Sequence, residues 1–182
     1  MSLAILCPGQ GGQHPDMFRR VQADPDACAL LAAAAVLLGD APTAAANRPI
    51  RFDNAIAQPL VCAGALSHWL ALKARLPVPT VVAGYSAGEL AAHAVAGSCD
   101  ATACLQLAVR RAACMDAASP ADAGLLAVLG LERGSIEALC AGRGVTVAIV
   151  NGDDHRVLGG LRADLLAVQA DAEQRGARCV VL

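Results

Sequence analysis

The run Gly-Tyr-Ser-Ala-Gly at 84–88 constrains the fold of this chain more than any other feature. A short apolar segment at 79–83 precedes it, and an alanine-rich helical pattern follows it. A Gly-x-Ser-x-Gly pattern between a strand and a helix indicates a nucleophile elbow, a sharp turn that exposes the serine hydroxyl at a helix N-terminus. Backbone amides stabilise negative charge there. The pattern therefore predicts Ser86 as a nucleophile; the alternative is an ordinary helix cap in a tight glycine turn.

The composition limits the classes of function that the chain can serve. Its 182 residues suit one domain, or one domain with a small inserted lobe. The formal net charge of −2 has interspersed signs, so we expect neither nucleic acid nor an anionic membrane as a partner. The longest apolar run, 27–38, is too short to span a bilayer, and the N-terminus shows no signal-peptide pattern.

The chain has eight cysteines, none of them in a Cys-x-x-Cys pair. Most lie inside apolar runs, which is typical of buried free thiols in a reducing compartment. We therefore expect a cytoplasmic protein with no metal site and no disulfide framework.

The order of predicted elements divides the chain into two lobes of an α/β protein. Residues 1–120 alternate strand and helix around a parallel sheet, as in α/β-hydrolase-like folds. Residues 121–182 read β-α-β-β-α-β, the ferredoxin-like unit. In the first lobe we expect strands at 3–7 and 79–83, a loop at 41–54, and helices starting near Asp16, at Pro25, at 55, at Ser86 and after Asp100. In the second lobe we expect strands at 124–129, 145–150, 155–158 and 177–182, with helices at 135–141 and 161–174. Because the last strand is apolar to its end, we expect the chain to be incomplete at its C-terminus.

A glycine-rich loop, Pro-Gly-Gln-Gly-Gly-Gln at 8–13, follows the first predicted strand. Its glycines let backbone amides face a ligand, so the loop can donate to an oxyanion. Its spacing matches neither the dinucleotide fingerprint nor the phosphate-binding loop with its lysine. A tight strand-to-helix turn without a binding role is the alternative interpretation.

Arg111 lies within an apolar stripe of the helix after Asp100. The stripe follows helical spacing through Cys104, Leu107, Ala108, Cys114 and Met115. An arginine in such a position needs an anionic partner. Either it forms a structural ion pair, or its guanidinium binds a substrate carboxylate in a bidentate manner.

Together, these features resemble the malonyl-CoA:acyl carrier protein transacylase family, which includes the epsilon subunit of malonate decarboxylase. The matching segments are 8–13 (family Pro-Gly-Gln-Gly-x-Gln), Ala-Gln-Pro at 57–59, 84–89 (family Gly-His-Ser-x-Gly-Glu), Arg111 with Met115, and 147–160 with Asn151. They run in family order along the whole chain, which corresponds to the first half of the family and a little more. The segment 14–18 and Tyr85 are more similar to the decarboxylase-associated members.

The resemblance implies a ping-pong acyl transfer. Ser86 would attack the thioester of malonyl-CoA, while the amides of Ala87 and Gln10 hold the oxyanion. Arg111 would bind the distal carboxylate, and the phosphopantetheine thiol of an acyl carrier protein would then take the malonyl group. The resemblance implies no metal and no permanently bound cofactor.

Two polar residues map to positions that line the family's cleft, namely Gln58 and Asn151; each is otherwise an ordinary helix or turn residue. Tyr85 stands where the family usually has histidine, which puts the acyl preference in question rather than the chemistry.

The general base is not found in this sequence. The family's histidine lies beyond the last ferredoxin-like strand, and none of His14, His68, His93 and His155 matches that position. His93 lies two turns down the helix from Ser86, and His14 is the candidate with any prospect of reaching it. We therefore expect weak or no turnover.

Two other classes of function remain open at this point. A serine hydrolase or thioesterase of the α/β-hydrolase type also uses Gly-x-Ser-x-Gly, but needs a histidine downstream and usually takes its oxyanion amide from another loop. A non-catalytic subunit that docks a carrier protein is the second alternative. An incomplete large lobe should expose apolar surface, so we expect self-association or a missing C-terminal segment.

Overall fold

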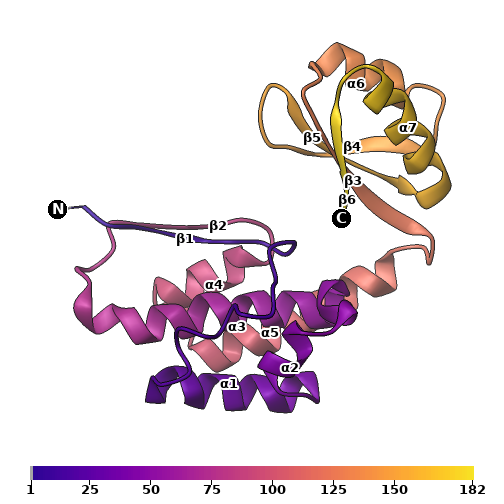
Figure 1. Ribbon diagram of the computed structural model, residues 1–182. Coiled ribbons are helices and arrows are strands. Elements are labelled where there is room, and N and C mark those ends of the chain that lie inside the picture. Colours follow the sequence, from indigo (N-terminus) through magenta and orange to yellow (C-terminus); the bar gives the residue numbers. More distant parts are fainter. Residues whose placement is uncertain (1) are drawn as a thin grey trace. The chain divides into compact units, whose positions relative to one another are not determined.

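The computed structural model describes residues 2–182, which form two compact units that divide between Ala117 and Ala118 (Figure 1). The first unit holds a parallel sheet with helices, and the second an antiparallel sheet with helices. The predicted α/β fold class is therefore confirmed.

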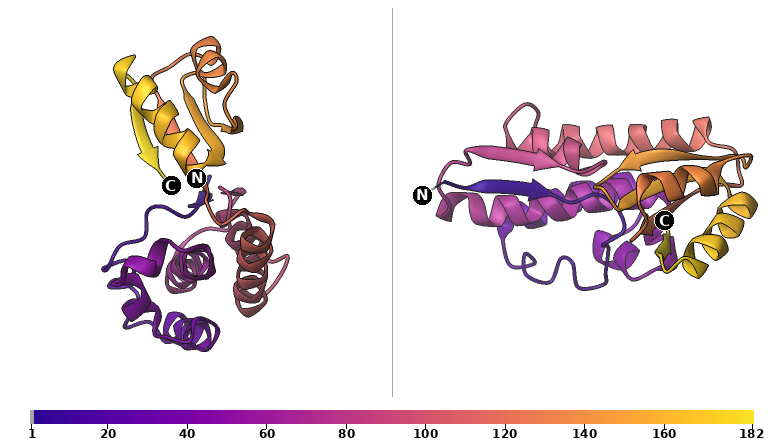
Figure 2. Two further views of the ribbon diagram at one scale, coloured as in Figure 1. Left: turned by 90° about the vertical axis from the view of Figure 1, so that its right-hand side faces the viewer. Right: turned by 90° about the horizontal axis from the view of Figure 1, so that it is seen from above.

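The sheet of the first unit consists of β1 (Ala4–Cys7) and β2 (Val81–Gly84), with Ala4 opposite Val81 and Cys7 opposite Gly84. The view from above in Figure 2 shows the two strands side by side along α3. The helices of this unit are α1 (Pro25–Leu38), α2 (Pro42–Ala46), η1 (Pro49–Phe52), α3 (Asn54–Leu72), η2 (Lys73–Arg75), α4 (Gly88–Val95) and α5 (Ala101–Ala118), of which the last residue lies past the unit boundary.

Capping residues set the ends of two helices, which begin where the sequence predicts, at Pro25 and after Asp100. The Asp24 carboxylate accepts from the Ala27 amide at 2.9 Å, Pro25 occupies the first turn of α1, and Gly39 ends that helix in the left-handed region. Asp100 caps α5 in the same way, accepting from the Ala103 amide at 2.7 Å.

Helix α3 passes through the core of the first unit. Its residues from Ala57 to Gly64 are all buried, and they pack with the buried face of α1 and with Ala91 of α4. By length and composition alone, the segment Asn54–Arg75 could cross a membrane, but more than half of its apolar window is buried inside the protein. It is thus explained as a core helix.

Two sequence predictions for the first unit were wrong. The segment after Asp16 forms consecutive turns rather than a helix, because its backbone bonds close after three residues, as in Arg19 to Asp16 and Val21 to Phe18. Burial of Phe18 and Val21 holds these turns against the core.

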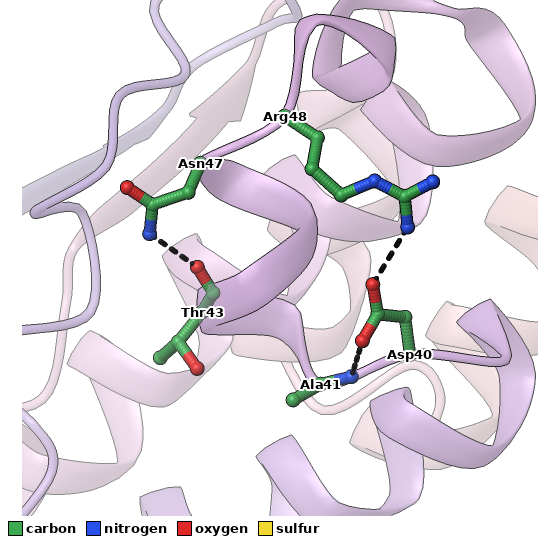
Figure 3. Close-up of polar contacts among 5 residues, drawn as sticks. All are labelled: Asp40, Ala41, Thr43, Asn47 and Arg48. Atoms are coloured by element: carbon green, nitrogen blue, oxygen red, sulfur yellow. Dashed lines mark hydrogen bonds and ion pairs between the residues drawn. The ribbon is translucent and has the colours of Figure 1, made fainter.

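The segment 41–54 is also not a simple loop, since it contains α2 and η1. Prolines occupy the first turn of both helices, where their missing amide costs nothing. Figure 3 shows how polar contacts join this region: Asp40 pairs with Arg48 at 2.8 Å, and the Asn47 amide donates to the Thr43 carbonyl at 2.7 Å.

One face of the β1–β2 sheet is apolar and exposed. Leu6 is 76% exposed and Val81 is 56% exposed, whereas Ile5 and Cys7, which point to the other face, pack into the core. The expectation of exposed apolar surface on the large lobe is confirmed on this face.

The second unit has the predicted β-α-β-β-α-β order. Its elements are β3 (Ala123–Leu129), α6 (Arg133–Cys140), β4 (Val145–Val150), β5 (His155–Leu161), α7 (Arg162–Gln174) and β6 (Arg178–Val181). The antiparallel sheet has the order β4-β5-β3-β6, which is the ferredoxin-like arrangement. Leu126, Val128 and Leu158 of the sheet form one core with Ile136 of α6 and Val168 of α7.

Candidate active site

The turn between β2 and α4 has the strained geometry of a nucleophile elbow. Ser86 has φ 53, and it is the one non-glycine residue with positive φ within 2–182. This left-handed conformation costs about 1–3 kcal/mol for a residue with a side chain, and such strain collects at functional sites. The turn is closed by backbone bonds from Gly88 to Tyr85 at 2.9 Å and from Glu89 to Ser86 at 3.0 Å.

The two glycines of the elbow are required by close packing. A Cβ on Gly84 would lie 2.2 Å from the Gly88 carbonyl oxygen, and one on Gly88 would lie 2.3 Å from the Cys7 carbonyl oxygen. Strand β2 and helix α4 can therefore meet at this angle only where both positions lack side chains.

The glycine-rich loop after β1 lies against the elbow. A Cβ on Gly9 would lie 2.8 Å from the Tyr85 carbonyl oxygen and 3.5 Å from Ser86 Cβ. Buried Gln13 anchors the loop, because its side chain donates to the Arg51 carbonyl at 2.9 Å. The residue that follows Gly9 is Gln10, whose backbone amide is the predicted oxyanion donor; that role stays a prediction.

Three predicted site residues come together. Arg111, on α5, donates from Nη2 to Ser86 Oγ at 3.4 Å and from Nη1 to Gln58 Oε1 at 2.6 Å. Gln58 is fully buried in α3. The guanidinium is thus held beside the serine hydroxyl by a neutral amide oxygen.

The alternative of a structural ion pair for Arg111 does not fit these contacts. The ion pairs found within 2–182 join Arg48 to Asp40, Arg133 to Glu137 and Arg143 to Asp171, and none involves Arg111. The predicted apolar stripe is also wrong in part, since Leu107 and Cys114 are exposed while Leu105 and Ala112 are buried. The buried face of α5 is rotated away from the predicted one, and Arg111 lies at its margin.

Sequence reasoning missed Asn54, at the start of α3. Its Oδ1 accepts from Gln10 Nε2 at 3.0 Å and from Gln58 Nε2 at 3.5 Å, and its Nδ2 donates to Asp116 Oδ1 at 2.8 Å. The available signal was its position four residues before Gln58, which puts both side chains on one face of the helix.

The two remaining predicted site residues, Ala87 and Asn151, lie in different units of the chain. Ala87 is fully buried at the start of α4, directly after Ser86, and its carbonyl accepts from Cys62 Sγ at 3.4 Å. Asn151 belongs to the second unit, at the turn between β4 and β5, where its amide nitrogen lies 3.4 Å from His155 Nε2. Their roles in oxyanion and substrate binding stay predictions.

None of the hydrogen bonds that Ser86 Oγ makes within 2–182 involves a histidine. His68 is bonded through Nδ1 to the Gly64 carbonyl at 2.8 Å, inside its own helix, and His155 lies beside Asn151. His14 and His93 are exposed. That the base is missing from this sequence stays a prediction.

The thiols beneath the site are kept neutral. A hydrogen bond with Cys62, together with burial, raises the pKa of the Cys104 thiol well above its ordinary value. Burial, and to a lesser degree the neighbouring Cys104, raises the pKa of the Cys7 thiol. These thiols serve as small apolar packing groups rather than nucleophiles.

A cavity of about 580 Å³ adjoins the loop 8–13 and α3. Neither Ser86 nor Arg111 lines it, so it is not the predicted acyl site. No group of three or more His, Cys, Asp or Glu residues within 2–182 has an arrangement that could hold a metal ion.

No protein-family model matches the chain. It is 37% identical over 136 residues to the malonyl CoA-acyl carrier protein transacylase of Mycobacterium bovis, a match that spans 70% of this chain and 45% of that protein. The chain thus spans about half the length of the curated relatives that it matches.

Solved structures extend the likeness to the whole chain. The malonyl-CoA:acyl carrier protein transacylase of Helicobacter pylori matches all of it with a TM-score of 0.86 and 28% identity, over 62% of that protein. A malonyl-transacylase solved in complex with its type II polyketide synthase acyl-carrier protein has the same fold, with a TM-score of 0.85 and 24% identity over the whole of this chain and 62% of that protein. The predicted resemblance to this family is confirmed.

Proposed function

Because the chain is a relative of the malonyl-CoA:acyl carrier protein transacylases, we propose that it supplies the nucleophile and the carboxylate-binding arginine of a malonyl transferase. The observation that carries the proposal is the 3.4 Å contact between Arg111 Nη2 and Ser86 Oγ. A malonyl group has one methylene between its carboxylate and its thioester carbonyl. A guanidinium adjacent to the nucleophile can therefore bind the carboxylate while the hydroxyl attacks the carbonyl.

In the first half-reaction, Ser86 Oγ attacks the thioester carbonyl of malonyl-CoA and loses its proton. The amides of Ala87 and Gln10 are the proposed donors to the oxyanion of the tetrahedral intermediate. The intermediate collapses to malonyl-Ser86, and coenzyme A leaves as its thiol. In the second half, the phosphopantetheine thiol of an acyl carrier protein attacks the ester and releases Ser86.

Substrate selection follows from charge. Arg111 is held by the buried oxygen of Gln58, and none of the ion pairs found within 2–182 includes it, so a malonyl carboxylate would be its partner. An acetyl group brings no such anion and leaves the guanidinium unpaired. Asn151 is proposed as a further polar contact to the substrate. The location proposed is the cytoplasm, because the eight cysteines are free thiols.

Two observations favour the transferase over a serine hydrolase. The loop after the first strand packs on the elbow through Gly9, where a transacylase takes its oxyanion amide. A cationic group beside the nucleophile suits an anionic acyl group rather than a neutral ester. The carrier could be an acyl carrier protein or a carrier of malonate decarboxylase. The similar proteins described above are transacylases of acyl carrier proteins, so we propose an acyl carrier protein.

Incubation with radiolabelled malonyl-CoA tests this function. We expect label on Ser86, less label with acetyl-CoA, none in Ser86→Ala, and release of the label by acyl carrier protein that bears phosphopantetheine. Labelling should be slow, because none of the hydrogen bonds that Ser86 Oγ makes within 2–182 involves a histidine. Roughly 10³–10⁴-fold catalysis over water survives loss of the base in serine triads. Equal labelling of Ser86→Ala, or faster turnover of a p-nitrophenyl ester than of malonyl-CoA, would overturn the proposal.

A further inference from the structure

Asn54 joins three elements of the candidate site through one side-chain amide. It accepts from Gln10 of the glycine-rich loop and from Gln58 of α3, and it donates to Asp116 of α5. The residues involved all lie in the first unit. The links continue from Gln58 to Arg111 and from Arg111 to Ser86.

In this series of hydrogen-bonded side chains, Arg111 at one end and Asp116 at the other determine which atoms donate and which accept. Arg111 can only donate, so Gln58 must turn its oxygen toward the guanidinium and its nitrogen toward Asn54. At the other end, an ionised Asp116 can only accept, so Asn54 must turn its nitrogen toward the carboxylate and its oxygen inward. An amide at position 54 satisfies both requirements, and neither a carboxylate nor an apolar side chain does.

We propose that Asn54 is a positioning residue, which Asp116 orients so that it holds both the Gln10 loop and the Gln58–Arg111 pair beside Ser86. The inference rests on the proposed function and deepens it. The Asn54 Oδ1 atom thereby restrains Gln10, whose backbone amide is proposed to bind the oxyanion. Through Gln58, the same oxygen restrains Arg111, which is proposed to bind the carboxylate. Preorganisation of this kind lowers the cost of ordering the site when a ligand arrives.

A donor–acceptor swap separates this role from a general loss of stability. Asn54→Asp has the same shape but opposes two carboxylates at positions 54 and 116, and Asp116→Asn removes the acceptor that orients Asn54. The double variant restores a complementary pair, because the new amide at 116 donates to the new carboxylate at 54, which still accepts from Gln10. Asn47→Asp is the matched control, since its side-chain amide donates to the Thr43 carbonyl (Figure 3) and no side-chain bond from Asn47 to the candidate site is found within 2–182.

The first readout needs no substrate. Phenylglyoxal modifies accessible arginines, and fragment-ion mass spectrometry, which separates Arg111 from the adjacent exposed Arg110, gives the rate at Arg111. We expect Asn54→Asp to raise that rate severalfold, the double variant to return it to the parent value, and Asn47→Asp to leave it unchanged. A double variant that is modified as fast as Asn54→Asp would overturn the positioning role.

The second readout is the ratio of dissociation constants for acetyl-CoA and malonyl-CoA, measured by calorimetry in a Ser86→Ala background. Asn54→Asp should lower the preference for malonyl-CoA about tenfold, the loss expected for one displaced charge-assisted contact, and the double variant should recover it. A parent chain without preference for malonyl-CoA would count against the proposed function, while the modification rates would still decide the role of Asn54. A preference that Asn54→Asp leaves intact would overturn the inference.

Discussion

The carbonyl oxygen of Cys7 lies against the α-carbon of Gly88, so that a Cβ on Gly88 would approach it to 2.3 Å. The end of the first strand and the start of α4 are thereby locked together at the site of the elbow. The two residues are 81 positions apart in the sequence, and the sheet of this unit consists of the two strands β1 and β2.

Gly88→Ala should therefore destabilise the protein, because the neighbour of the added methyl is backbone and cannot rotate away. We expect a loss of at least about 1–3 kcal/mol, as for other overpacked sites, and a lower midpoint in urea unfolding. Gly134→Ala is the control, since a Cβ there meets nothing within 4 Å and the position lies in α6. Equal stability of the two variants would contradict the packing seen at Gly88.

The strain at Ser86 leads to a second prediction, of opposite sign. Ser86→Gly removes the side chain from a residue at φ 53, so the folded state should gain up to about 1 kcal/mol while acylation is lost. Ser86→Ala loses the same hydroxyl but keeps the Cβ, so it should gain little. Thermal unfolding of the two variants side by side gives the difference. If alanine stabilises as much as glycine, the gain does not come from backbone strain.

Local signals carried the sequence-based prediction of the fold. Pro25 and Asp100 indicated where α1 and α5 begin, and the ferredoxin-like arrangement of the second unit followed from its pattern of strands and helices. Prediction failed where a local pattern was overridden by tertiary packing. The segment after Asp16 has helical composition, but burial of Phe18 favours successive turns.

The candidate site shows the same division. The elbow and its glycines could be predicted because tight backbone geometry demands particular residue types at fixed spacing. Arg111 was found from its place in an apolar helix, although the buried face of α5 was assigned wrongly. Asn54 and Asp116 were not found, since polar residues at exposed or half-buried positions look like ordinary surface until a partner from another element is known.

Arg111→Lys tests the carboxylate-binding role. A lysine keeps the charge but loses the planar fork, so it cannot bond Gln58 and a carboxylate in the same geometry. We expect the rate of Ser86 labelling by malonyl-CoA to fall about 10–100-fold, with labelling by acetyl-CoA changed little. Arg110→Lys is the control, because Arg110 is next to Arg111 on the same helix and its side chain is exposed. An equal fall for both acyl groups would assign Arg111 to the stability of the elbow instead.

The raised pKa of the Cys104 and Cys7 thiols predicts a loss of stability at alkaline pH. The folded protein favours the neutral form of each thiol. At a pH between the thiol pKa of the unfolded chain, about 8.5, and the higher pKa in the folded protein, the folded state therefore binds more protons than the unfolded chain. Stability from this source is complete below about pH 8.5 and falls as pH rises, by up to about 1.4 kcal/mol per pH unit for each thiol. Urea unfolding from pH 7.5 to 10 should show Cys104→Ala with a shallower decline than the parent. Val95→Ala, a core truncation without a titrating group, should lower stability at every pH by the same amount. Parallel curves for the parent and Cys104→Ala would show that the thiol ionises as readily in the folded protein as in the unfolded chain.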